Sequence, residues 1–426
     1  MTEALLHHIW QHQMLSPGLT TTDGQPIVVL KAGELNDDAG PDFTNARVRI
    51  GEMEWAGNIE VHIHTSDWKR HHHSTDAAYN NLVLHVVYEH DCEIKLQNGR
   101  VPATLELKQF LHPSIIRNYE FLTTPKPDSL FPCASRVGEV PELVLHSFME
   151  RLTVERIAAK SETVRRMLAE NHGNWEQTCY WLISRYFGGK INALAFELLA
   201  KATDPRLLAR WRNNSQRTEA LLMGQAGLLE GYFEEDYPRA LQADYEPLRK
   251  ASSLTPIDGS LWKFYRLRPS SFPTIRISQL ANLISQTGNL FSRLLEITDG
   301  KELEALFNQQ AAPYWDNHYT FDRETERTTH KRVGVMQADV LIINAWVPLL
   351  FVYGTEHGQQ RYKDQALSIL EQLLAENNNI VRQWKQAGIC PRNAADSQAL
   401  LQLTHDYCSS RQCLRCRIGY HILRKP

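Results

Sequence analysis

The feature that most constrains the fold of this chain is a change of hydrophobic period after its first 110 residues. Up to about residue 110, short apolar and β-branched runs such as "PIVVLKAG" and "NLVLHVVYEH" alternate with turn signals. Beyond about residue 140, apolar residues recur at helical spacing, first in "PELVLHSFMERLTVERIAAKSETVRRMLAE". Short alternating runs indicate strands, and a period of 3.6 residues indicates helices. The sequence therefore predicts an α+β fold with a large, mainly helical region after the strands.

Domain boundaries follow from the stretch between these two regions. Five prolines fall between positions 113 and 141, and proline at this density is typical of linkers. We therefore predict an α/β domain over residues 1–110, a proline-rich linker over 111–140 and a helical domain over 141–426. No fixed-period repeat is visible after residue 140, so the helical domain is not expected to be a solenoid.

The first 110 residues predict a definite order of elements. "MTEALLHHIWQHQMLSPG" reads as an amphipathic helix that buries Leu5, Leu6, Ile9, Trp10 and Leu15. "NARVRIGEMEWAGNIEVHIH" alternates with period two, broken at Gly51 and at "AGN", which indicates neighbouring antiparallel strands. A short loop or helical segment and a central apolar strand follow.

Composition adds few constraints on function. The chain of 426 residues is 42% hydrophobic and 22% charged, with a formal net charge of -3, as in ordinary globular proteins. A nucleic-acid site would therefore need a local basic patch. There is no run of 18 apolar residues and no basic n-region followed by an apolar core. We expect no membrane segment and a cytoplasmic location; the oligomeric state is left open.

Carboxylates and imidazoles occupy the predicted strands in an orderly way. Asp42 begins one strand, and Glu60 and His62 lie two residues apart on the next, so they share a face while Val61 points to the other side. The hairpin between them is long enough to bring Asp42 beside Glu60. Hard cations that assist phosphate hydrolysis prefer such oxygen ligands. The alternative is a solvent-facing strand that follows a turn.

These motifs resemble a known nuclease superfamily. "PD" at positions 41–42 and "EVH" at positions 60–62 resemble the PD-(D/E)XK superfamily. The resemblance covers the first quarter of the chain and implies a restriction-endonuclease-like core. It implies that Asp42 and Glu60 bind Mg²⁺ or Mn²⁺, with the carbonyl of Val61 as an optional third ligand. The lysine of the motif falls on His62, which would position or deprotonate water instead.

A second resemblance covers the whole chain. "GPDF", "GNIEVHIHTSDW", "YNNLVLHVVYEHD" and "CLRCRIG" are similar to segments of an uncharacterised bacterial family, a domain of unknown function. This resemblance implies no activity.

Several neighbouring residues could support the site. His64 shares the predicted face of Glu60, and Glu34 is a further carboxylate nearby. Lys69, Arg70 and His71 open a polar loop that could meet phosphate oxygens, and the histidine run that follows could instead bind a transition metal. His85 interrupts an apolar strand and is expected to be a buried, hydrogen-bonded core residue.

A second metal site is predicted near the C-terminus. Cys408, Cys413 and Cys416 form a C-x4-C-x2-C pattern, and Cys390 is the expected fourth thiolate, with His405 or His421 as substitutes. Four such ligands would hold zinc or a [4Fe–4S] cluster. The alternative is a packed helical hairpin with reduced thiols.

Three functions are compatible with these residues. The first is a divergent metal-dependent nuclease that hydrolyses phosphodiester bonds in DNA or RNA. The second is a cupin-like protein in which Glu60, His62, His64 and His85 hold one transition metal. The third is a catalytically inactive scaffold that binds nucleic acid or protein.

Overall fold

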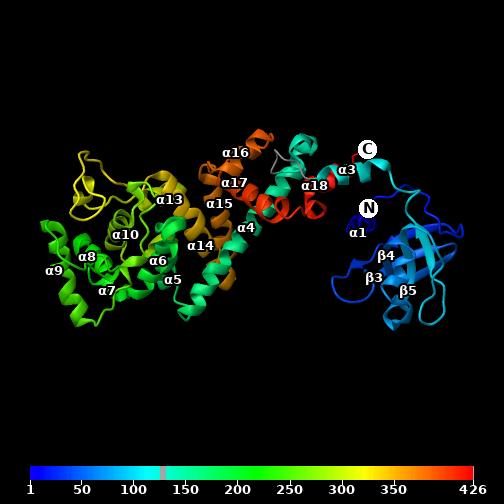
Figure 1. Ribbon diagram of the computed structural model, residues 1–426, viewed down its shortest axis with the longest axis horizontal. Helices are drawn as coiled ribbons and strands as arrows, with labels where there is room; N and C mark the ends of the chain where they lie inside the picture. Colours follow the sequence, from blue (N-terminus) through cyan, green and yellow to red (C-terminus); the bar gives the residue numbers. More distant parts are fainter. Residues whose placement is uncertain (125–130, 426) are drawn as a thin grey trace. The chain divides into compact units, whose positions relative to one another are not determined.

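The structure is a computed structural model that describes residues 1–124 and 131–425 (Figure 1). The chain folds into two compact units. The first comprises Met1–Phe148, Gln383–Ile389 and Leu403–Pro426, and the second comprises Met149–Arg382 and Cys390–Gln402. This division differs from the predicted boundaries at 110 and 140, because the C-terminal segments pack with the sheet-containing unit. Part of the predicted linker, residues 125–130, lies outside the described residues.

The first unit is built on a mixed sheet. Its strands are β1 (Ile27–Lys31), β2 (Glu34–Leu35), β3 (Phe43–Ile50), β4 (Met53–His64), β5 (Leu82–Glu89) and β6 (Ala103–Glu106). The strand order is β1-β3-β4-β5-β6, with β2 also paired to β3. The β1–β3 and β3–β4 pairs are antiparallel, and β4–β5 and β5–β6 are parallel. The predicted α+β class is confirmed: a mixed sheet is followed by a large helical region.

Two glycines shape the central strand β4. Gly51, at φ +60°, makes the turn between β3 and β4, a conformation that glycine adopts without steric cost. The predicted break at "AGN" is wrong, because β4 continues through Gly57. A Cβ on Gly57 would lie 2.4 Å from the carbonyl oxygen of Asn81. This glycine therefore permits a close approach of the chain entering β5 and does not end the strand.

Helix α1 (Glu3–Gln11) covers part of the sheet, in contact with β4. Its buried apolar residues are Leu5, Leu6, Ile9 and Trp10, as the amphipathic pattern predicts. Leu15 is only half-buried, because the helix ends before it. The indole Nε1 of Trp10 donates a hydrogen bond to the carbonyl of Ala32 at 2.9 Å, which ties the helix to the strand edge.

Short helices complete the first unit. They are α2 (Asp67–Arg70), η1 (His73–Thr75), η2 (Ala77–Tyr79), α3 (Pro113–Thr123), η3 (Ala134–Glu139), η8 (Leu403–Cys408), η9 (Cys413–Arg415) and α18 (Arg417–Leu423). The first three connect β4 to β5, and α3 lies where a linker is expected from the prolines. Proline is tolerated in the first turn of a helix, and here Pro113 opens α3.

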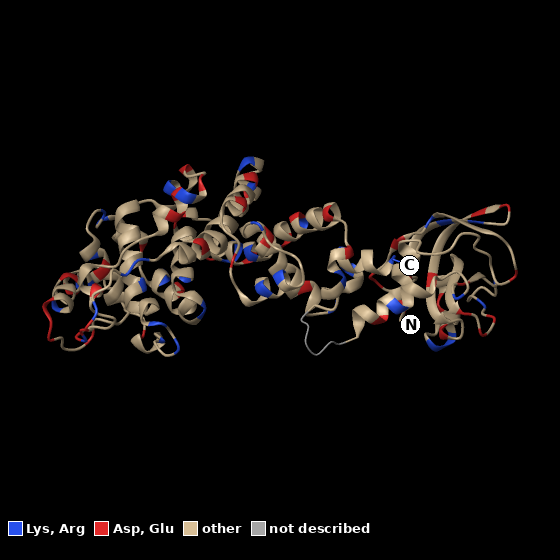
Figure 2. Ribbon diagram, turned by 90° about the horizontal axis from the view of Figure 1, so that it is seen from above, with Lys and Arg blue, Asp and Glu red and all other residues tan. Residues whose placement is uncertain are grey.

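The second unit is helical within the described residues. Its helices are α5 (Trp175–Phe187), α6 (Gly189–Ala202), α7 (Pro205–Ala209), α8 (Ser215–Gln225), α9 (Asp236–Ala251), α10 (Pro273–Thr287), α11 (Leu290–Glu296), α12 (Gly300–Phe307), α13 (Val335–Leu341), α14 (Val347–Glu356), α15 (Gln360–Gln372) and α17 (Ala394–Gln402). Helices α4 (Glu142–Glu170) and α16 (Asn379–Gln386) each have residues in both units. Acidic and basic residues are interspersed along these helices (Figure 2).

One segment of the second unit is unusually apolar. Val335–Glu356, which includes α13 and α14, is long and apolar enough to cross a membrane by length and composition. Of its most apolar window, 61% is buried inside the fold. Core helices of globular proteins have the same character.

Candidate functional site

Asp42 and Glu60 lie side by side at one end of the β3–β4 hairpin. Phe43 of β3 is paired with Ile59 of β4, which places the two acidic residues across from each other. The backbone N–H of Asp42 donates to Glu60 Oε2 at 3.1 Å, and the backbone N–H of Val61 donates to Asp42 Oδ2 at 2.9 Å. These bonds fix both carboxylates to the backbone of the neighbouring strand. The hairpin therefore brings together the pair expected from the sequence.

The strand that carries Glu60 and His62 is buried on both faces. Glu60, Val61 and His62 are exposed by only 4%, 1% and 1%, so the alternative of a solvent-facing strand is wrong. In the parallel pair β4–β5, Glu60 lies opposite His85, and His62 Nδ1 lies 2.9 Å from His85 Nε2. His85 is fully buried, as expected, but its hydrogen-bond partner is a residue of the site.

The loop between β4 and β5 brings two further histidines to this point. His71 Nδ1 lies 3.2 Å from His62 Nε2, and His73 Nε2 lies 3.1 Å from Glu60 Oε1. Glu60 Oε1 also lies 3.5 Å from His62 Nε2. The ligand atoms of the three histidines lie within 4.8 Å of one another, the only such group of His, Cys, Asp or Glu in the described residues. We call Asp42, Glu60, His62, His71, His73 and His85 the histidine–carboxylate cluster.

Aromatic packing holds the loop over the sheet. The ring of His73 lies 4.1 Å from that of Tyr79 and 5.2 Å from that of Trp68, centroid to centroid. Trp68 is fully buried. The carboxylate of Asp67, at the start of α2, accepts a hydrogen bond from the backbone N–H of His64 at 2.9 Å. The helix that precedes His71 is thereby anchored to the end of β4.

Helix α1 contributes a residue that sequence reasoning missed. His7 Nε2 lies 3.3 Å from Asp42 Oδ2. The sequence signal was a pair of histidines in an amphipathic helix, but only tertiary packing shows which of them faces the sheet. Burial alone would lower the pKa of His7, but the hydrogen bond and the charges of Asp42, Glu3 and Glu60 raise it overall.

The electrostatics of the cluster are dominated by burial. Burial raises the pKa of Glu60, and Asp42 adds to that effect while His73 opposes it. Burial, followed by the charges of His71 and His73, lowers the pKa of His62 to about 3. A neutral imidazole is the form that binds a metal ion.

Buried polar atoms in and beside the cluster are left without hydrogen-bond partners. In the described part of the chain, the buried atoms His85 Nδ1 and Trp68 Nε1 have no hydrogen-bond partner. Buried polar groups are rarely left unpaired unless a water, an ion or a functional role accounts for them. A divalent cation between Glu60, His62, His71 and His73 would meet both carboxylate and imidazole ligands, and the donor set fits such an ion.

Other predicted supporting residues lie outside the cluster. Glu34 is exposed and pairs with Lys31 at 2.7 Å. The backbone N–H of His64 donates to Asp67, and Asp91, two residues after β5, lies within electrostatic range of His64. The structure therefore does not bring Glu34 or His64 to the cluster.

The two basic residues of the loop lie on α2. Lys69 and Arg70 are both exposed, and the guanidinium of Arg70 contacts the carboxylate of Asp67. They directly precede His71, an exposed residue of the cluster, and we call these three consecutive residues the rim.

The four C-terminal cysteines are divided between the units. Cys390 is exposed and belongs to the second unit, whereas Cys408, Cys413 and Cys416 belong to the first. The prediction of Cys390 as the fourth ligand thus joins residues of different units.

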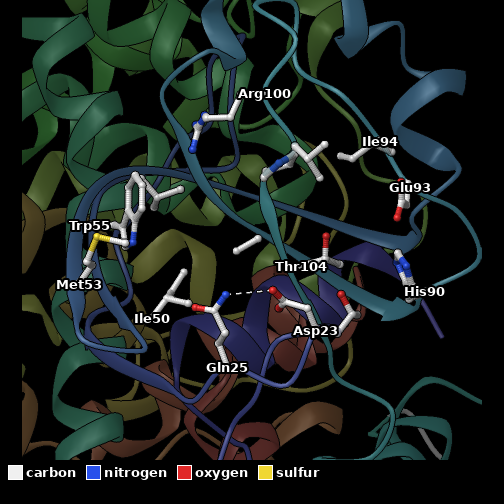
Figure 3. A pocket seen from close by; sticks show the side chains of 15 residues that line it. Asp23, Gln25, Ile50, Met53, Trp55, His90, Glu93, Ile94, Arg100 and Thr104 are labelled. Carbon is white, nitrogen blue, oxygen red and sulfur yellow. Dashed lines mark hydrogen bonds between the residues drawn. The ribbon is translucent and has the colours of Figure 1, made fainter.

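A pocket of about 600 Å³ also opens on the first unit. In Figure 3 the side chain of Gln25 reaches Asp23, with a hydrogen bond of 3.0 Å between them, while Met53 and Trp55 line another wall. None of the residues that line the pocket belongs to the histidine–carboxylate cluster. The pocket is a separate feature of the surface.

Comparison with known proteins identifies a family. The family model described as "Protein of unknown function (DUF2851)" matches residues 3–379. The expected similarity to a family of unknown function is confirmed. The match ends before the cysteines at position 390 and beyond. No curated protein and no solved structure matches the chain.

Proposed function

We propose the following function for this chain, which belongs to the family described as protein of unknown function (DUF2851): it is a metal-dependent hydrolase that cleaves phosphodiester bonds in nucleic acid. The observation that carries the proposal is the convergence of Glu60, His62, His71 and His73, with Asp42 beside them. A bound divalent ion would supply Lewis-acid activation of the phosphate and of a water molecule.

The donor set favours particular ions. Imidazole nitrogen suits zinc and other transition metals, whereas carboxylate oxygen suits Mg²⁺ and Mn²⁺. A mixed set of one carboxylate and three imidazoles favours Mn²⁺ or Zn²⁺ over Mg²⁺, since Mg²⁺ is bound mainly by oxygen. The sequence predicted Mg²⁺ or Mn²⁺ bound by Asp42 and Glu60; the proposed site adds three imidazole ligands and therefore adds Zn²⁺ to the candidate ions.

The order of elements in the first unit supports the proposal of a nuclease-like fold. Helix α1 packs on a sheet whose β1, β3 and β4 are antiparallel and whose next strand, β5, runs parallel to β4. The PD-(D/E)XK core has a helix, three antiparallel strands, a helix and a further strand. We propose that the first unit is a divergent version in which His62 replaces the lysine of the motif.

The alternative of a cupin-like barrel is less well supported. The described sheet is an open path from β1 to β6 with two parallel pairs, whereas a barrel has a sheet closed on itself. Transition-metal binding without hydrolysis remains compatible with the histidines and becomes an outcome of the test.

The choice of substrate follows from charge at the rim. Lys69, Arg70 and His71 are consecutive and exposed, and His71 reaches His62 from this position. Cationic side chains beside a site meet phosphate oxygens. A polyanionic substrate could therefore be held by the rim while its backbone reaches the cluster.

The test combines metal binding with cleavage. Chelator-treated protein is titrated calorimetrically with Mn²⁺, Zn²⁺ and Mg²⁺, and then assayed on end-labelled single- and double-stranded DNA and RNA. Glu60→Gln removes the central carboxylate, and Glu34→Gln, at an exposed carboxylate outside the cluster, is the matched control. We expect cleavage with Mn²⁺ or Zn²⁺ to fall by at least about 100-fold in Glu60→Gln and to persist in Glu34→Gln.

Two other outcomes would overturn the proposal in different ways. Tight metal binding without cleavage of any substrate would identify a protein that binds a transition metal without hydrolysing nucleic acid, as in the cupin-like alternative. No metal binding at the cluster would exclude a metal-dependent reaction there and favour a scaffold.

A further inference from the structure

Four cysteines of the first unit occupy the ends of short elements that meet one another. Cys133 precedes η3, and Cys416 precedes α18, each as the N-cap residue. Cys413 begins η9, and Cys408 ends η8. Helix α18 contacts η3, η9 and α3, and η8 contacts η9. The element that follows Cys133 is therefore in contact with the C-terminal segment that carries the other three thiols.

Polar contacts fix this arrangement. The side-chain amide of Asn118, on α3, donates to the carbonyls of Ile422 and Lys425 at 2.9 and 2.8 Å. Arg136, on η3, donates to Asn118 Oδ1 at 2.7 Å. Arg411 donates to the carbonyl of Thr123 at 2.8 Å. The C-terminal segment is held against both elements that flank Cys133 in sequence.

The C-x2-C turn is tightly packed. A Cβ on Gly419 would lie 2.1 Å from the carbonyl oxygen of Cys413, so only glycine lets α18 lie against η9. The thiol of Cys413 faces the carbonyl of Leu122 at 3.8 Å. Cys133, Cys413 and Cys416 are exposed by 7%, 9% and 7%.

The thiols also affect one another electrostatically. Cys133, Cys413 and Cys416 all lie near enough to Cys408 to act on it electrostatically. Cys390, the predicted fourth ligand, is not among the groups that act on Cys408. Four thiolates gathered in one region repel each other unless a cation lies between them.

We propose that Cys133, Cys408, Cys413 and Cys416 form a four-thiolate metal site, in which Cys133 takes the place predicted for Cys390. The site would bind a thiophilic centre, zinc or a [4Fe–4S] cluster, both of which use four cysteines. The sulfur atoms do not lie as close together as the histidine ligands do, since only those meet a 4.8 Å spacing in the described chain. Metal binding would draw them together. The site would fasten the C-terminal end of the chain to the segment that follows α3, independently of the function proposed for the histidine–carboxylate cluster.

The decisive variants are Cys133→Ser and Cys390→Ser, compared after anaerobic purification in a His62→Ala background that removes the other metal site. Zinc and iron are counted per chain by mass spectrometry, and a visible charge-transfer band distinguishes the cluster from zinc. We expect Cys133→Ser to lose at least about 90% of the metal, as Cys413→Ser does, and Cys390→Ser to retain it. Retention in Cys133→Ser with loss in Cys390→Ser would overturn the assignment.

A measurement on the unsubstituted chain covers the case in which Cys133→Ser does not fold. The reduced protein is alkylated with a maleimide with and without prior addition of Zn²⁺, or of Fe²⁺ with sulfide, and modified cysteines are mapped by peptide mass. We expect the metal to protect Cys133, Cys408, Cys413 and Cys416 together, while Cys390 reacts equally in both samples. Unchanged reactivity of Cys133 in the presence of metal that protects Cys413 would contradict the proposal.

Discussion

The two units differ in the groups that surround a buried carboxylate. In the helical unit, Glu219 is fully buried and accepts hydrogen bonds from Ser278 Oγ at 2.6 Å and Trp315 Nε1 at 2.7 Å. In the sheet unit, Glu60 is equally buried, but its near neighbours include Asp42 and the imidazole of His62. The first carboxylate is surrounded by donors, whereas the second is one of several groups that compete for the same protons.

This difference separates a structural polar group from a candidate site. A buried carboxylate that is met by hydrogen-bond donors needs nothing more to be stable. Glu197 of the helical unit is a second example, with Arg185 at 2.6 Å and Lys201 at 2.8 Å. Several lone-pair donors that face one another are stabilised by a cation instead. The functional assignment therefore depends on how the partners combine and not on burial alone.

The largest expected effect tests the central ligand. His62→Ala should weaken binding of Mn²⁺ or Zn²⁺ by at least about 100-fold, because His62 contacts Glu60, His71 and His85 and loss even of an outer-shell partner costs 10- to 100-fold. Titration calorimetry on chelator-treated protein measures the affinity. Glu219→Gln is the matched control from the helical unit and should bind metal normally. Equal metal affinities in His62→Ala and Glu219→Gln would show that the cluster binds metal no better than a structural buried carboxylate does.

The helical unit should show the pH dependence of a buried acid. Burial raises the pKa of Glu219 to about 7, although Ser278, Trp315 and Tyr237 oppose the shift. The folded state therefore holds the proton more tightly than the unfolded state, and the stability that results is complete below the ordinary pKa of glutamate. It is lost as the pH rises through about 7. At about 1.4 kcal/mol per pKa unit, the loss approaches about 3 kcal/mol.

Urea unfolding at pH 5, 6, 7 and 8 measures this slope for the wild type and for Glu219→Gln. The variant cannot ionise at this position, so its free energy of unfolding should vary less between pH 5 and 8. Parallel pH profiles for the two proteins would show that Glu219 is not the group responsible.

A smaller effect is expected from the helix that supports the site. His7→Ala removes the imidazole 3.3 Å from Asp42 and should reduce metal affinity or turnover by about tenfold, as loss of an outer-shell partner does. His12→Ala, one turn further along and packed against Tyr420, serves as the control. A difference of less than twofold between the two variants would remove His7 from the site.

The smallest expected effect concerns His64. His64→Ala should change metal affinity by less than about twofold, since its contacts lie toward Asp67 and Asp91 and not toward the histidine–carboxylate cluster. The same titration measures it. A loss as large as that expected for His62→Ala would restore the cupin-like ligand set of Glu60, His62, His64 and His85.

Local patterns determined what lies within one element or one hairpin. The helical period of residues 141–170 predicted α4 over Glu142–Glu170, and the alternation before and after Gly51 predicted the hairpin that brings Asp42 beside Glu60. Such patterns suffice because side-chain direction and strand pairing follow from the backbone period. The same reasoning was wrong at "AGN", where Gly57 permits the close approach of the chain entering β5 and does not end β4.

Only the tertiary structure decided which distant residues lie beside those that the sequence singled out. His7 comes from a helix, His73 from a loop and His85 from a parallel strand, and their local sequence does not determine that all three lie beside Glu60. Cys133 is likewise separated from Cys408, Cys413 and Cys416 by the whole helical unit, while the nearer Cys390 folds elsewhere. The physical reason is that sequence period fixes the face on which a side chain lies, whereas the packing of one element on another decides what that face meets.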